Sequence, residues 1–445
     1  MTHVTLSTDF RYHEGSRSRV RAEQRMGTLI ILFAALILLE GVLRKWALPE
    51  FHQPLAFIRE PSLLLIYAFY VKDFGVQRWW FNYYAILSAL IVVLALSQAI
   101  YWQLPIIIPA LGVRSYVFYI PLAFIMADVL THRQMGRILR FLLWVSIPVG
   151  ILVLVQFLSP VAHPINKGTS DDVAKRFTVV QDIIRPYGPF TFTAAQAHFG
   201  AMMLAILAIC VDGRRKYEIS IFLLLISGFS ILTMGALSGG RTYFGFAILV
   251  VTACIFSGFS VSRVVDGAKR IFLVFCGVGV FLTVFIFVFP RSFAAMTERQ
   301  LAAQSVEGST VGRVLNGFYE IVDPFFYAPL FGYGVGAGSN AGRSIMGTAD
   351  AFTLGETEWA RMVNELGPII GYPVFGLRVL LVVWLMRVAF SANQRTSDGS
   401  ALILFGFSGY LLLAGQVTLQ NQLLAICWFS VGLLMAFARL ARTPQ

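Results

Sequence analysis

Residues 401–438 read ALILFGFSGYLLLAGQVTLQNQLLAICWFSVGLLMAFA and contain no charged side chain. A helix needs about 20 apolar residues to cross a bilayer, so this stretch holds two candidate spans, 401–417 and 422–438. Ten further apolar stretches are long enough to be spans, and charged residues interrupt the second and the fourth: 27–43, 55–71, 83–100, 105–127, 138–158, 191–211, 219–237, 242–258, 271–289 and 367–387. The sequence therefore predicts an all-α polytopic membrane protein with about twelve transmembrane helices.

The composition supports a membrane protein. Of the 445 residues, 57% are hydrophobic and only 13% are charged, whereas soluble domains carry about 25% charged residues. All four cysteines lie inside apolar runs, so we expect them to be packing residues and predict neither a disulfide framework nor a zinc site. The polar, arginine-rich first 25 residues show no cleavable signal pattern before the first span.

Basic residues indicate the orientation of the chain. They cluster in alternate connections, for example at residues 133–140 and 214–216, and cytoplasmic loops carry an excess of Lys and Arg. Both termini are therefore predicted to be cytoplasmic. The net charge of +12 is then a topology signal and a match to an anionic inner leaflet. A nucleic-acid partner is not expected, because no basic, aromatic-rich soluble domain is present.

This topology divides the chain into five parts. They are a cytoplasmic tail (1–26), nine spans (27–289) with an outer loop at 159–190, a large outer loop (290–366), three spans (367–438) and a cytoplasmic tail (439–445). The two long outer segments are where binding and catalytic residues are expected.

The large outer loop contains a glycine-rich run, LFGYGVGAGSNAG, at residues 330–342. Ser339 and Asn340 follow its last alternating glycine, so the Lys of a nucleotide-binding P-loop is missing, and a dinucleotide fingerprint would need a βαβ unit. We expect no nucleotide and no metal cofactor. Alternating glycines allow close backbone approach to a ligand, but a flexible surface hairpin is an equally good interpretation of the run alone.

Charged side chains flank the glycine run on two predicted helices. Arg313, Asn316 and Glu320 share one face of an amphipathic helix beginning near residue 311. Downstream, in ETEWARMVNELGPIIG (356–371), Glu358, Arg361 and Glu365 have the same spacing. For Glu358 and Arg361 an ion pair that anchors a helix end is the alternative to a functional role.

Several arginines lie within or beside apolar stretches. Arg114, Arg185 and Arg241 belong to the outer half of the predicted topology. Arg44, Arg59 and Arg378 also lie within or beside apolar stretches. An arginine in a span costs at least a few kcal/mol unless it is paired or faces water. Structural ion pairs are one interpretation, with Glu60 or Glu40 as the partner of Arg59. Together with Arg313 and Arg361, these side chains otherwise suit a bound anion such as a phosphate.

Four stretches carry a resemblance to a known family: GVRSYVFYIPL (112–122), RPYGPFTFTAAQAHF (185–199), SGGRTYFG (238–245) and the region 313–371. They resemble the O-antigen polymerase and O-antigen ligase superfamily of bacterial inner-membrane glycosyltransferases, most closely its exopolysaccharide-polymerase branch. The ligases carry a His-Asn pair upstream of the ELG element, where this chain has Glu356 and Thr357. That departure favours a polymerase.

The resemblance implies a GT-C-type enzyme and a substrate carried on undecaprenyl diphosphate. Such a polymerase moves the growing glycan from its lipid diphosphate onto the non-reducing end of the next lipid-linked repeat unit, with membrane lipids, a chain-length regulator and a flippase as further partners. The diphosphate would be bound by Arg114, Arg185, Arg241, Arg313 and Arg361. Glu358 or Glu356 would be the base, Arg241 and Arg313 would act in catalysis, and Gly334, Gly336, Gly338, Asn340 and Glu365 would form the pocket. A ligase, or a flippase or transporter of lipid-linked sugars, is the alternative.

Overall fold

The computed structural model describes residues 6–76, 78–168, 178–180, 183–259, 264–295, 297–298, 319–347, 354–355 and 357–442. Two candidate site residues, Arg313 and Glu356, lie outside this set, as does most of the amphipathic helix expected from residue 311.

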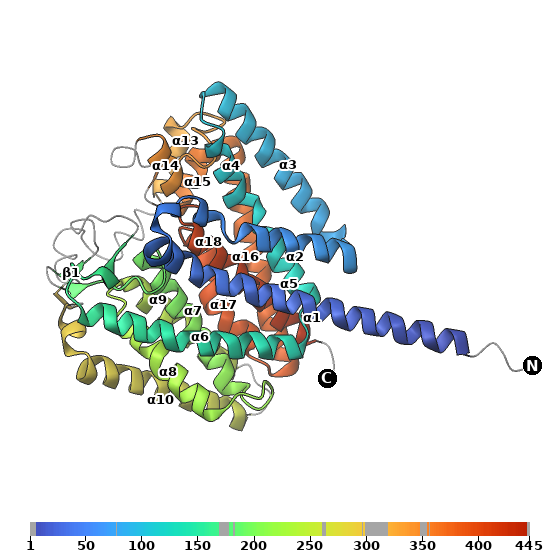
Figure 1. The fold of residues 1–445 in the computed structure, drawn as a ribbon, viewed down its shortest axis with the longest axis vertical. Coiled ribbons are helices and arrows are strands. Elements are labelled where there is room, and N and C mark those ends of the chain that lie inside the picture. The colour runs from blue at the N-terminus through green and yellow to red at the C-terminus, as the bar shows by residue number, and fades with distance from the viewer. Residues whose placement is uncertain are drawn as a thin grey trace, which may run out of the picture.

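The described chain is almost entirely helical (Figure 1). Its first half contains α1 (Leu6–Val42), the π-helix η1 (Leu43–Ala47), the 3-10 helices η2 (Pro49–Phe51) and η3 (Pro54–Phe57), α2 (Glu60–Asp73), α3 (Arg78–Tyr101), α4 (Ile107–Val113), the π-helix η4 (Arg114–Phe118), α5 (Ile120–Val129), α6 (His132–Leu158) and η5 (Pro164–Asn166). A two-stranded antiparallel ribbon, β1 (Thr178–Val180) and β2 (Ile183–Ile184), follows.

The second half contains α7 (Thr193–Asp212), α8 (Ile221–Ala236), α9 (Arg241–Phe259), α10 (Val264–Thr283) and the π-helix η7 (Val284–Val288). After the large loop come the short helices α13 (Pro324–Tyr327), α14 (Asn340–Ile345) and α15 (Glu358–Leu366), and then α16 (Pro368–Thr396), α17 (Ser400–Ala414) and α18 (Asn421–Leu440).

Nine helical stretches in the described part of the chain are long and apolar enough to cross a membrane. Three shorter apolar helices, Ile221–Ala236, Phe275–Val288 and Ser400–Ala414, occupy the remaining positions where spans were expected. The expectation of an all-α, multi-pass membrane protein is confirmed. That all twelve stretches cross the bilayer stays a prediction.

Helix α18 lies at the centre of the bundle, and α16 lies at its lipid-facing periphery. In the most apolar 18-residue segment of α18, 94% of the residues are buried, whereas in that of α16 only 11% are buried. Glycines allow the helices to approach closely, as is common between membrane helices. A Cβ added at Gly432 of α18 would lie 3.1 Å from the Cα of Ala123 on α5, and one added at Gly406 of α17 would lie 2.7 Å from the carbonyl oxygen of Leu249 on α9.

Alternation of helix direction brings distant connections to one end of the bundle. The segment after α1, the start of α4, the segment before α7, the turn before α9, helices α14 and α15, and the turn before α18 all meet there. Figure 1 shows both chain ends on the other side of the molecule from β1 and α14. The predicted topology places this shared end, called the loop end below, on the outer side of the membrane.

Candidate functional site

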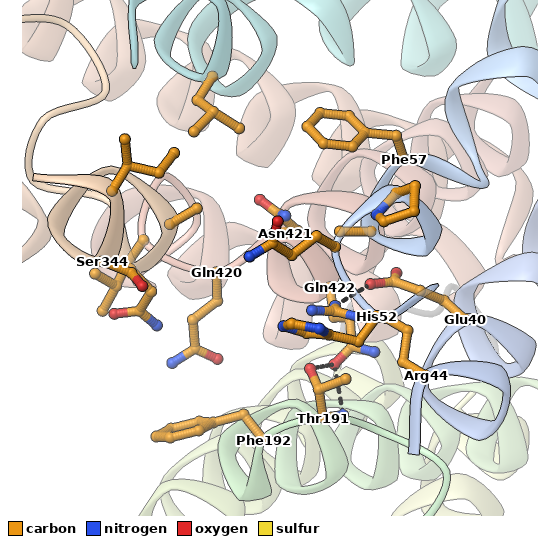
Figure 2. A pocket seen from close by; sticks show the side chains of 18 of the residues that line it. Glu40, Arg44, His52, Phe57, Thr191, Phe192, Ser344, Gln420, Asn421 and Gln422 are labelled. Carbon is orange, nitrogen blue, oxygen red and sulfur yellow. Dashed lines mark hydrogen bonds and ion pairs between the residues drawn. The ribbon is translucent and has the colours of Figure 1, made fainter. Parts of the chain in front are cut away.

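A cavity of about 550 Å³ opens at the loop end (Figure 2). Five segments of chain that are far apart in sequence form its wall, which is the arrangement expected of a ligand site between helices. The lining residues are Glu40, Arg44, His52, Gln53, Pro54, Ala56, Phe57, Ile107, Leu111, Thr191, Phe192, Asn340, Ala341, Ser344, Ile345, Leu419, Gln420, Asn421 and Gln422.

The two oppositely charged side chains in this wall form an ion pair, and the carboxylate is shared with a third, buried charge. Glu40 Oε1 accepts a hydrogen bond from Arg44 Nη1 at 2.7 Å, and its second oxygen lies 3.1 Å from Nη2 of the fully buried Arg59. Glu40, and not the adjacent Glu60, is therefore the partner of Arg59. A buried guanidinium is tolerated only with such a partner, so this carboxylate is committed to the two arginines.

Glu60 instead binds Arg114, one of the arginines expected at the diphosphate. The Nε atom of Arg114 donates to Glu60 Oε1 at 2.5 Å, and its Nη2 donates to the carbonyl oxygen of Ala56 at 3.1 Å. The guanidinium also lies 4.8 Å from the ring centre of Phe57. Because Ala56 and Phe57 line the cavity, Arg114 supports the cavity wall from behind.

Three consecutive amides, Gln420, Asn421 and Gln422, dominate the polar part of the wall and follow the turn between α17 and α18. The backbone N–H and hydroxyl of Thr191 donate to Gln422 Oε1 at 3.1 and 3.0 Å. Among the described residues that line the cavity, four buried side-chain atoms have no hydrogen-bond partner: Gln422 Nε2, Gln420 Oε1, Arg44 Nε and Glu40 Oε2, the last of which is paired with Arg59 by charge. Figure 2 shows Gln420 projecting into the space between Ser344 and Phe192.

The glycine-rich run is a packed structural segment. It is buried from Gly334 to Ser339, and Gly336 has a φ of 91°, where a side chain would also collide with the carbonyl oxygen of Ile108 on α4. Glycine therefore lets this backbone lie directly against α4. Of the five expected pocket residues, only Asn340 lines the cavity, at the start of α14.

Glu365 anchors the glycine run to α15. Its Oε1 accepts from the backbone N–H of Gly338 at 2.7 Å, and its Oε2 accepts from the hydroxyl of Tyr116 at 2.8 Å. Burial raises the pKa of this carboxyl from 4.5 to about 7, against the opposing effects of Arg361 and these hydrogen bonds. Glu365 thus positions the loop and does not line the cavity.

Glu358 and Arg361 form the anchoring ion pair that the sequence left open. Glu358 is also 2.9 Å from Arg378 Nη1, and Thr418 donates to it from its backbone N–H at 3.2 Å and its hydroxyl at 3.1 Å. This network joins α15, α16 and the turn before α18. Neither Glu358 nor Arg361 lines the cavity.

Arg185 and Arg241 come from two of the four motifs, and the fold brings these motifs together. A Cβ added at Gly240 would lie 2.9 Å from Arg185 Nη2, so this guanidinium rests on the residue that precedes Arg241. Arg241 is the first residue of α9. The same segment that begins with Arg185 supplies Thr191 and Phe192 to the cavity.

Comparison of the chain with protein-family models and with curated protein sequences finds no match. The resemblance to polysaccharide polymerases therefore stays a prediction that depends on the four stretches themselves.

Sequence reasoning missed His52 and the three amides as site residues. The signal for the amides was present, because Gln420, Asn421 and Gln422 stand together in a run of 38 uncharged and mostly apolar residues. His52 carried no such signal. It lies in the irregular segment after α1, and only the fold brings that segment against α14 and α18.

Proposed function

We propose that this protein is a membrane glycosyltransferase that polymerises lipid-linked oligosaccharide repeat units at the outer face of a bacterial inner membrane. The observation that carries the proposal is the cavity of about 550 Å³ at the loop end. Its wall includes several neutral hydrogen-bonding side chains and the segment that begins with Arg185. A glycosyltransferase for lipid-linked sugars needs such a site next to cations, because it must hold a sugar and stabilise a departing diphosphate.

The proposed reaction is a direct displacement with inversion at the anomeric carbon. The oxygen of the acceptor hydroxyl bonds to that carbon while the bond from the carbon to the diphosphate oxygen breaks. The diphosphate leaves with the electron pair, and the hydroxyl proton passes to a base. Arg185 and Arg241, with Arg313 from the large outer loop, are assigned to the diphosphate, since preorganised guanidinium groups stabilise developing negative charge.

His52 is the best-placed base among the described residues. The cavity wall contains three ionisable side chains, Glu40, Arg44 and His52, and Glu40 is already held by two arginines. Imidazole is the commonest general base in enzymes. Glu358 is bound by two arginines and Thr418 away from the cavity, so we assign it a positioning role.

The test uses the full chain in proteoliposomes supplied with single lipid-linked repeat units. We expect Arg241→Ala and Arg313→Ala to abolish polymer and to leave single repeat units on the lipid, as judged by gel analysis of the products. Arg291→Ala is the matched control, because Arg291 is exposed and belongs to none of the four motifs. Long chains made by both variants would contradict the assignment of the diphosphate site.

A further inference from the structure

We propose that the cavity binds the uncharged, hydroxyl-bearing part of a glycan through Gln420 and Gln422, and that the phosphates bind outside it. This inference rests on the proposed function for the role of the glycan, but its evidence is the chemistry of the cavity wall.

The charge of the wall disfavours a diphosphate inside the cavity. Arg44 is the only cationic residue that lines it in the described part of the chain, and Glu40 lies 2.7 Å from its Nη1. Glu40 is shared by Arg44 and the buried Arg59, so this cluster carries one net positive charge, which cannot balance the two or more negative charges of a diphosphate. Removing those charges from water without enough opposing charge is strongly unfavourable.

The pattern of donors and acceptors favours hydroxyl groups. The orientation of the Gln422 amide is determined by Thr191, whose backbone N–H can only donate, so Oε1 must face Thr191. Gln422 Nε2 is then an unpaired donor, and Gln420 Oε1 is an unpaired acceptor. A sugar hydroxyl can both donate and accept, whereas a fully ionised phosphate only accepts.

The site is preorganised. Gln420 is 8% exposed and Gln422 is 3% exposed, so neither amide can fully recover its lost hydrogen bonds from bulk water. A buried polar group without a partner is costly, and a ligand that supplies the partner recovers that cost. Phe192 and Phe57 add apolar ring surface to the same wall, against which the C–H faces of a pyranose can pack.

Gln422→Glu is the decisive substitution because it is nearly isosteric. It keeps an oxygen for the two hydrogen bonds from Thr191 and, when the new carboxyl group is ionised, replaces the free donor by an acceptor. Gln420→Leu removes the free acceptor. Gln394→Leu is the matched control, since Gln394 is exposed on α16 at the end of the bundle opposite the cavity.

The experiment is saturation-transfer NMR on the full chain in nanodiscs with glucose, galactose, mannose and N-acetylglucosamine, each with and without inorganic pyrophosphate. We expect at least one sugar to bind saturably and pyrophosphate not to displace it. We expect Gln422→Glu and Gln420→Leu each to weaken this binding about tenfold, the loss typical of one buried hydrogen bond, and Gln394→Leu to leave it unchanged.

Three outcomes would overturn the inference: no sugar binds, pyrophosphate displaces the sugar, or Gln422→Glu binds it as well as the unaltered chain does. None of these readouts requires turnover. Sugar binding without polymerase activity would therefore count against the proposed function alone, and polymer formation with unaltered sugar binding in both variants would count against this inference alone.

Discussion

The charge cluster beside the cavity predicts a large and specific loss of stability when Glu40 is replaced by glutamine. Arg59 is fully buried, and Glu40 is its ion-pair partner at 3.1 Å. After Glu40→Gln, Arg59 would keep its hydrogen bond to the carbonyl oxygen of Asn421 at 3.0 Å but no opposite charge from Glu40. Removing one partner of a buried ion pair costs about 3–5 kcal/mol, and we expect a loss of that size in the free energy of unfolding.

The second variant separates the ion pair from simple packing. Glu40→Gln combined with Arg59→Met replaces the unpaired buried charge of Arg59 by an apolar side chain of similar length. Most of the lost free energy of unfolding should therefore be recovered. Glu218→Gln is the matched control: Glu218 is 87% exposed and lies 3.9 Å from Arg140, and such exposed pairs contribute little.

Denaturant unfolding in detergent micelles, followed by tryptophan fluorescence, measures all four proteins. The reasoning is refuted if Glu40→Gln is no less stable than Glu218→Gln. It is also refuted if the double variant is as unstable as Glu40→Gln alone, because the unpaired buried charge would then not be the cause.

Three further predictions concern the glycine run, α15 and the proposed base. Gly336→Ala should lower the unfolding midpoint far more than Gly347→Ala, because both positions have positive φ but only Gly336 lies against backbone. Folding raises the pKa of Glu365 from 4.5 to about 7, so its contribution to stability is full below pH 4.5 and is lost as the pH rises through 7. In Glu365→Gln the unfolding midpoint should therefore depend less on pH between 4.5 and 7. His52→Gln should slow polymer formation about 10²- to 10⁴-fold, whereas His163→Gln should not, because His163 does not line the cavity.

The sequence located the helices well and the ion pairs poorly. Every predicted span coincides with an apolar helix, because apolar length is a local property. The partner of Arg59 could not be chosen from sequence, since adjacent side chains such as those of Arg59 and Glu60 point away from each other on a helix. The structure pairs Arg59 with Glu40 on α1 and Glu60 with Arg114 beside α4.

The cavity and the expected site share few side chains. Of the expected pocket residues only Asn340 lines the cavity, and Thr191 and Phe192 come from a motif that the sequence singled out. The glycines proved to pack against α4 and α15. Alternating glycines indicate that the backbone closely approaches a ligand or another part of the chain. Which of the two it approaches depends on tertiary contacts.

The sequence by itself determined that this chain is a helical, multi-pass membrane protein. A bilayer offers the backbone no hydrogen-bond partners, so long apolar stretches must form helices whatever surrounds them. Only the tertiary structure decided which charges pair with each other and which buried polar atoms are left without a hydrogen-bond partner. Those properties depend on distances of a few ångströms between residues from separate helices. Glu40, His52, Thr191 and Gln422 share one cavity only because the C-terminus of α1 and the N-termini of α7 and α18 come together.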